Sequence, residues 1–147
     1  MYKHILVSTD GSKLSQKAIK SAVRLAKSVG ARLSGIYVMP EYMPIYGEAS
    51  LYITQMSSKT FKAAMDKDAN AALALIAKEA DAARVAFAGI KATNAQPWSA
   101  IIRAARAKKC DLIVMASHGR RGLAGLLLGS ETAKVLTHSK VPVLVCR

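Results

Sequence analysis

Apolar and polar residues follow two different periods along this 147-residue chain, and the two periods alternate. Short, mainly apolar runs occupy residues 4–9, 32–39, 111–116 and 141–146, and a weaker one occupies residues 85–93. Runs of this length with little polar alternation are typical of strands that are buried on both faces of a sheet. We therefore predict five strands at these positions.

The segments between these runs have the period of amphipathic helices. In the first of them, Leu14, Ala18, Ala22, Leu25 and Val29 recur every three or four residues, with lysine and arginine between them. Helices are predicted at residues 14–29, 59–84, 98–108 and 130–139. Residues 40–58 contain two prolines and have no clean period, so we expect a long connection there.

Strands that alternate with helices indicate an α/β fold. We predict a single domain, residues 1–147, with one doubly wound parallel sheet and helices on both faces. Ligands of such sheets bind beyond the carboxyl ends of the strands, where the strand order reverses. The first strand ends in Thr9-Asp10-Gly11-Ser12 and the fourth in a glycine-rich loop. If these two strands are neighbours, their loops share one crevice.

The glycine-rich loop has the features of a phosphate site. Glycine lets a ligand approach main-chain N–H groups, and Gly129 stands directly before a predicted helix, whose first turn has unpaired N–H donors. Ser130 can cap this helix or turn its hydroxyl toward a phosphate. The alternative is a glycine-rich turn that binds nothing. Neither GxxxxGK[ST] nor GxGxxG follows the first strand, which disfavours a P-loop ATPase and an ordinary dinucleotide-binding dehydrogenase.

The net charge is +13 and is concentrated near the two ends of the chain: +6 in residues 1–35, zero in 36–100 and +7 in 101–147. Such a field favours an anionic partner, but lysines and arginines at helical spacing are more often solvated helix faces than nucleic-acid sites. No apolar run is long enough to span a membrane and no secretory signal is recognisable, so we expect a cytoplasmic protein without a membrane partner.

Several separated motifs resemble the universal stress protein family in order along the whole chain. They are the opening ILVSTDGS, the strand end IYVM, DLIVMASHGRRG, LLLGSETAKVL and the closing HSKVPVLVCR. The spacing A-x2-G-x9-GS from Ala116 is similar to the family's G-x2-G-x9-G[S/T] nucleotide loop. The resemblance implies a sheet in the order 3-2-1-4-5, a homodimer formed through the last strand, and ATP, with or without Mg²⁺, at the point where the strand order reverses.

Carried over by motif, the resemblance also implies roles for individual residues. Thr9 and Asp10 would lie against adenine and ribose, and Val38, Met39 and Met115 would line the adenine pocket. The triphosphate would be surrounded by Gly119, Arg120, Gly129, Ser130 and Glu131. Ala116 replaces the family's first loop glycine. His118 can donate to a phosphate, act as an acid or base, or simply bond the backbone, and Asp10 can instead cap the first helix or help to hold a divalent ion.

We therefore expect an ATP-binding regulatory protein of the stress response, with an unidentified protein partner. The sequence offers no complete set of catalytic residues and no metal-ligand cluster. A slow ATP hydrolase or phosphotransferase that uses Asp10 and His118 is the alternative, and a nucleic-acid binder is the least favoured. Gly129→Val is expected to abolish nucleotide binding while leaving the fold largely intact.

Overall fold

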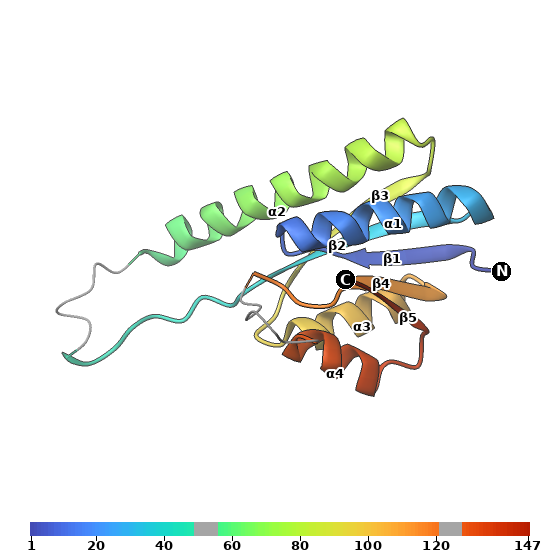
Figure 1. Ribbon diagram of the computed structural model, residues 1–147. Coiled ribbons are helices and arrows are strands. Elements are labelled where there is room, and N and C mark those ends of the chain that lie inside the picture. Colours follow the sequence, from blue (N-terminus) through green and yellow to red (C-terminus); the bar gives the residue numbers. More distant parts are fainter. Residues whose placement is uncertain (49–55, 121–127) are drawn as a thin grey trace.

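The computed structural model describes residues 1–48, 56–120 and 128–147. Strands and helices alternate along the chain as the sequence predicts (Figure 1). In order they are β1 (His4–Ser8), α1 (Lys13–Val29), β2 (Arg32–Met39), α2 (Ser58–Ala82), β3 (Phe87–Thr93), α3 (Pro97–Ala107), β4 (Leu112–Ala116), α4 (Ser130–His138) and β5 (Val143–Cys146).

The five strands form one parallel sheet in the order β3-β2-β1-β4-β5, which confirms the predicted fold. From β1 the chain moves outward to β2 and β3, and then returns to place β4 on the other side of β1. Val7 of β1 pairs with Val114 of β4. The strand order therefore reverses between β1 and β4, and the loops that follow these two strands leave the same edge of the sheet side by side.

Helices cover both faces of the sheet, with α1 and α2 on one face and α3 and α4 on the other (Figure 1). Because successive strand residues point to opposite faces, Ile5 and Val7 pack in the core beneath α1 and α2. Leu6 and Ile113 pack with Ile101 of α3 in the core of the other face. The central strands are thus buried on both sides, which explains their continuous apolar runs.

The ends of α1 follow the expected local rules. Ser12 is the N-cap and its hydroxyl accepts a hydrogen bond from the Ser15 N–H at 3.2 Å. Gly30 ends the helix in the left-handed conformation, with φ of +69°. Over the described residues, none of the helices combines the length and apolar character that crossing a bilayer requires.

Candidate functional site

A cavity of about 800 Å³ lies where the strand order reverses, beyond the carboxyl ends of β1 and β4. Eleven of the twelve residues predicted from the sequence line it: Thr9, Asp10, Val38, Met115, Ala116, His118, Gly119, Arg120, Gly129, Ser130 and Glu131. The topology therefore brings together two segments that lie more than a hundred residues apart in the chain. The volume falls within the range of about 300–1,000 Å³ typical of small-molecule sites.

Met39 is the predicted residue that does not line the cavity. Val38 and Met39 are consecutive in β2, so their side chains point to opposite faces of the sheet. Val38 packs with the cluster on the α3 side, whereas Met39 packs against Tyr37, Ala69 and Ala72 on the α2 side. The structure thus contradicts the expectation that both residues line an adenine pocket.

Sequence reasoning missed several lining residues, among them a group from the end of β3 to the start of α3. Asn94, Ala95 and Pro97 line the cavity, as do Pro40, Ile36 and Ile101. The parallel topology contains the signal that could have found this segment, because every loop that follows a strand leaves the same edge of the sheet.

Asp10 joins the two loops that form the polar side of the cavity. Its Oδ1 accepts a hydrogen bond from the Ser12 N–H at 2.9 Å, and its Oδ2 accepts one from the Arg120 N–H at 2.8 Å. Burial opposes ionisation of this carboxyl, but the hydrogen bonds from Ser12 and Arg120 and the Arg120 charge outweigh it and lower the pKa of Asp10. Asp10 does not cap α1, since Ser12 occupies that position.

Gly119 and Arg120 fit closely around this connection. A Cβ at position 119 would lie 2.5 Å from Asp10 Oδ2, so the carboxylate leaves no space for a side chain there. The Arg120 guanidinium lies over Gly11, where a Cβ would be 2.8 Å from Nη2. Arg120 therefore covers the β1–α1 loop, and its neighbour Arg121 lies outside the described residues.

The polar groups of Thr9 are used within the β1–α1 loop. Its N–H donates to the Ile36 carbonyl at 3.0 Å, and its Oγ1 accepts from the Gly11 N–H at 3.1 Å and lies 3.0 Å from Ser15 Oγ. Thr9 is buried. It therefore shapes the wall of the cavity from beneath, while Asp10 lies at the surface of that wall.

Gly129 allows two parts of the chain to approach closely. Its N–H donates to the Ser117 carbonyl at 2.6 Å, and an added Cβ would lie 3.0 Å from His118 Cα. Its φ of −72° is open to any residue. The glycine therefore serves the protein's own packing, and we expect Gly129→Val to strain the fold as well as the site, which differs from the expectation that the fold stays largely intact.

The cavity reaches the first turn of α4 directly after Gly129. Gly129 is the N-cap and Ser130 is the first helical residue, so of the two alternatives for Ser130 the structure does not show the cap. Ser130, Glu131 and Thr132 all line the cavity. The first N–H groups of an α-helix have no acceptor within the helix and attract anions.

His118 has a local partner, because its Nδ1 lies 3.2 Å from Ser117 Oγ. This partner is a side-chain hydroxyl, not the backbone partner that was one of the three roles considered for His118. Both oxygens of Asp10 accept backbone hydrogen bonds, one from its own loop and one from the loop after β4, so the two candidate catalytic side chains both have protein partners. Among the described residues, no group of His, Cys, Asp and Glu is arranged to hold a metal ion.

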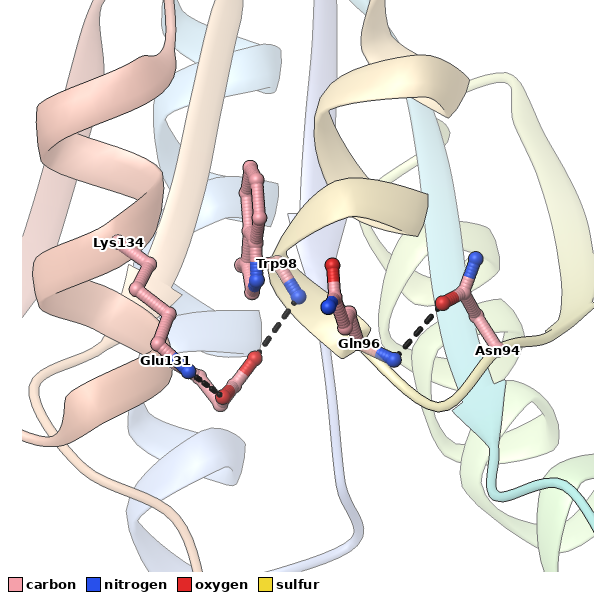
Figure 2. A network of polar contacts seen from close by, with 5 residues as sticks. All are labelled: Asn94, Gln96, Trp98, Glu131 and Lys134. Carbon is pink, nitrogen blue, oxygen red and sulfur yellow. Dashed lines mark hydrogen bonds and ion pairs between the residues drawn. The ribbon is translucent and has the colours of Figure 1, made fainter.

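Glu131 reaches across from α4 to the start of α3 (Figure 2). Its Oε2 accepts a hydrogen bond from the Trp98 N–H at 2.9 Å, and its Oε1 pairs with Lys134 Nζ at 3.3 Å. In the same turn, Asn94 Oδ1 accepts from the Gln96 N–H at 2.7 Å. The Glu131 carboxylate therefore forms the part of the cavity wall between the first turns of α3 and α4, and it is bonded there to protein groups.

The two ends of the cavity differ in chemistry. Val38, Ile101 and Met115 belong to the apolar cluster and form one side, which suits a flat, weakly polar ring. Asp10 and the first turn of α4 form the other side, which suits hydroxyl and phosphate groups. The arrangement can thus hold a molecule with an apolar ring at one end and an anion at the other.

Comparison with known proteins gives consistent relatives for the whole chain. The profile of the universal stress protein family matches residues 1–147. The universal stress protein MJ0531 of Methanocaldococcus jannaschii is 33% identical over 147 residues, which cover all of this chain and 83% of that protein. The solved structure of MJ0577 from the same organism has a TM-score of 0.81 at 27% identity and covers 99% of this chain and 96% of its own. A universal stress protein solved in complex with cAMP has a TM-score of 0.73 at 28% identity, with 99% and 97% covered.

Proposed function

The chain belongs to the universal stress protein family, and from that premise we propose that it binds an adenine nucleotide, with ATP as the ligand, in the cavity between β1 and β4. The observation that carries the proposal is the opening of this cavity onto the first turn of α4 at one end and onto the apolar wall at the other. A relative that covers nearly the whole chain has been solved with cAMP, which is also an adenine nucleotide.

In the proposed complex the adenine ring lies on the apolar wall formed by Val38, Ile101 and Met115. Asp10 accepts a hydrogen bond from the ribose, because a carboxylate has about four acceptor positions and two of them are used by Ser12 and Arg120. The phosphates lie at the first turn of α4, where the N–H groups of Ser130 and the residues after it supply donors.

Ala116 is compatible with this arrangement. It pairs with Cys146 in the sheet and is almost completely buried, and its carbonyl accepts a hydrogen bond from Thr132 Oγ1 at 3.0 Å. Its methyl group therefore belongs to a well-ordered strand end beside α4. We expect the substitution of the family's glycine by Ala116 to reshape the wall slightly without filling the site.

The described residues do not fit a dedicated Mg²⁺ site. They provide no group of ligating side chains, and the oxygens of Asp10 already accept two backbone hydrogen bonds. A divalent ion would therefore be held chiefly by the nucleotide's own phosphates.

The proposed role is binding that regulates a protein partner during stress, without obligatory turnover of ATP. A lowered pKa makes the Asp10 carboxylate a weak base, and His118 is bonded to its neighbour Ser117. The hydrolase alternative makes a different prediction: phosphate would be released over many turnovers and this release would stop in His118→Ala while ATP still bound.

We also propose a homodimer through β5. This strand pairs with β4 on one side and lies at the edge of the sheet, and Leu144 within it is 41% exposed. An apolar edge strand is a ready surface for pairing with another chain. A second copy of β5 would satisfy its free main-chain groups and cover Leu144.

Isothermal titration of nucleotide-stripped protein with ATP tests the binding proposal. We expect saturable 1:1 binding, competed by AMP and adenosine and not by GTP at equal concentration. The proposal would be contradicted if millimolar ATP produced no heat of binding and if AMP and adenosine did not compete with ATP in a parallel equilibrium-dialysis measurement.

A further inference from the structure

Two helices, α3 and α4, begin at the wall of the cavity. Pro97, the first residue of α3, and Ser130, the first residue of α4, both line it. The start of α4 presents N–H groups that have no acceptor within the helix. At the start of α3, Pro97 has no N–H and the Ser99 N–H donates to the Gln96 carbonyl at 3.1 Å, so the Trp98 N–H is the donor that faces outward there. Both starts also carry the positive end of a helix dipole. The cavity therefore has two positions at which an anionic group of a ligand would be favoured.

Glu131 distinguishes these two positions. Gln96, the N-cap residue of α3, makes no capping bond with its own side chain among the described residues. The acceptor comes from α4, where Glu131 Oε2 receives the Trp98 N–H at 2.9 Å (Figure 2). The anion position at the start of α3 is thus already filled by a carboxylate of the protein.

The remaining charges around the cavity add to this effect. Among the described residues that line it, Asp10 and Glu131 are acidic and Arg120 is the basic residue whose charge is permanent. Arg120 lies over Gly11 on the β1–α1 loop. In a chain with a net charge of +13, the described part of the cavity lining therefore has more carboxylates than guanidinium groups.

We propose that Glu131 is a specificity-determining residue for the phosphate end of the site: its carboxylate occupies the anion position at the start of α3, confines the ligand's phosphates to α4, and lowers the gain in affinity that each added phosphate brings. This inference rests on the proposed nucleotide binding. It adds that the site discriminates by phosphate number. The affinity gained from adenosine to AMP, ADP and ATP is smaller than it would be without the Glu131 carboxylate.

Lys134 sets the strength of the effect. Its Nζ lies 3.3 Å from Glu131 Oε1 and partly neutralises the carboxylate. Both side chains are part-exposed, 48% for Lys134 and 38% for Glu131, so water and salt screen their charges. We therefore expect a change of about 2- to 5-fold in affinity, the range of helix-end charge effects, which decreases at high salt.

The test compares the affinity for adenosine, AMP, ADP and ATP in three variants and the wild type by isothermal titration. Glu131→Gln keeps an oxygen that can accept from Trp98 but removes the charge. Lys134→Met removes the neutralising partner. Glu79→Gln makes the same change in net charge in the groove between α1 and α2, on the other face of the sheet, and serves as the matched control. Trp98 is the only tryptophan in the sequence, so its fluorescence checks that the start of α3 is unchanged.

In Glu131→Gln we expect the ratio of ATP affinity to adenosine affinity to rise about 2- to 5-fold at low salt, with adenosine binding and Trp98 emission unchanged. In Lys134→Met the same ratio falls, and in Glu79→Gln it stays at the wild-type value. A merely structural Glu131 would alter binding of all four ligands together.

An unchanged or lower ratio in Glu131→Gln would overturn the inference, as would an equal rise in Glu79→Gln, which would indicate net charge alone. If the wild type binds adenosine and ATP but the ratios do not respond, the inference fails and the proposed function stands. If the wild type binds none of the four ligands, both fail.

Discussion

Asp10→Asn weakens the hydrogen-bonded connection between the β1–α1 loop and the loop that follows β4, with almost no change in side-chain size. The carboxylate accepts one N–H from Ser12 and one from Arg120. An asparagine can keep its oxygen toward one of these donors, but its NH₂ group then faces the other. The variant therefore loses one of the two hydrogen bonds and leaves an N–H group opposed to another donor.

The cost follows from these contacts. A hydrogen bond to a charged group contributes about 1.5–3 kcal/mol, and partial exposure of Asp10 to water lowers this to about 1–2 kcal/mol. For a domain of this length that corresponds to a decrease in Tm of about 2–8 °C. Because the Arg120 loop also forms the polar wall, we expect ATP to bind about 5- to 30-fold more weakly, the factor equivalent to the same free energy.

Calorimetric unfolding and ATP titration of Asp10→Asn measure both effects, with Asp81→Asn as the control. Asp81 is an exposed carboxyl at the end of α2, so its variant makes the same change in charge without a loop connection. The lowered pKa of Asp10 adds a pH test: its contribution is present above the ordinary aspartate pKa and is lost as the pH falls through the lowered value. The stability difference from the wild type should be full at pH 7 and shrink below about pH 4. A Tm equal to that of Asp81→Asn at pH 7 would refute the reasoning.

Three further predictions concern other parts of the fold. Gly129→Ala should cost about 1–3 kcal/mol by overpacking against His118, measured by urea unfolding, whereas Gly89→Ala, with ordinary contact distances, should not. Burial and the Arg32 charge lower the pKa of His4, so its neutral form stabilises the fold above its ordinary pKa of 6.5. The free energy of unfolding should therefore fall between pH 7.5 and 5.5 in the wild type but not in His4→Gln. Leu144→Arg should sediment as a monomer at a concentration at which the wild type is a dimer; identical sedimentation would contradict pairing through β5.

The sequence predicts the elements of this fold well because the central strands are buried on both faces. Their apolar runs leave little ambiguity. The two edge strands each begin two residues later than predicted, β3 at Phe87 and β5 at Val143. The strand order came from the family resemblance, since periodicity does not say which strands are neighbours. Met39 is an error that strand alternation alone could have prevented, because its neighbour Val38 cannot face the same side.

The residues of the site were predicted better than their roles. Gly129 marks a phosphate loop in the sequence, but only the structure shows that its N–H and its missing side chain serve contacts with Ser117 and His118. Glu131 was expected to lie beside phosphates, and its partner Trp98 lies 33 residues earlier in the chain, on a different helix. Such roles depend on how α3 and α4 pack together, which no local pattern specifies.

The most direct test of the central claim is a crystal structure of the protein grown with excess ATP. We expect adenine against Val38, Ile101 and Met115, ribose beside Asp10, and phosphates at the first turn of α4. A nucleotide bound elsewhere, for example at the basic groove of Lys20, Arg24 and Lys27 between α1 and α2, with this cavity filled only by water, would contradict it.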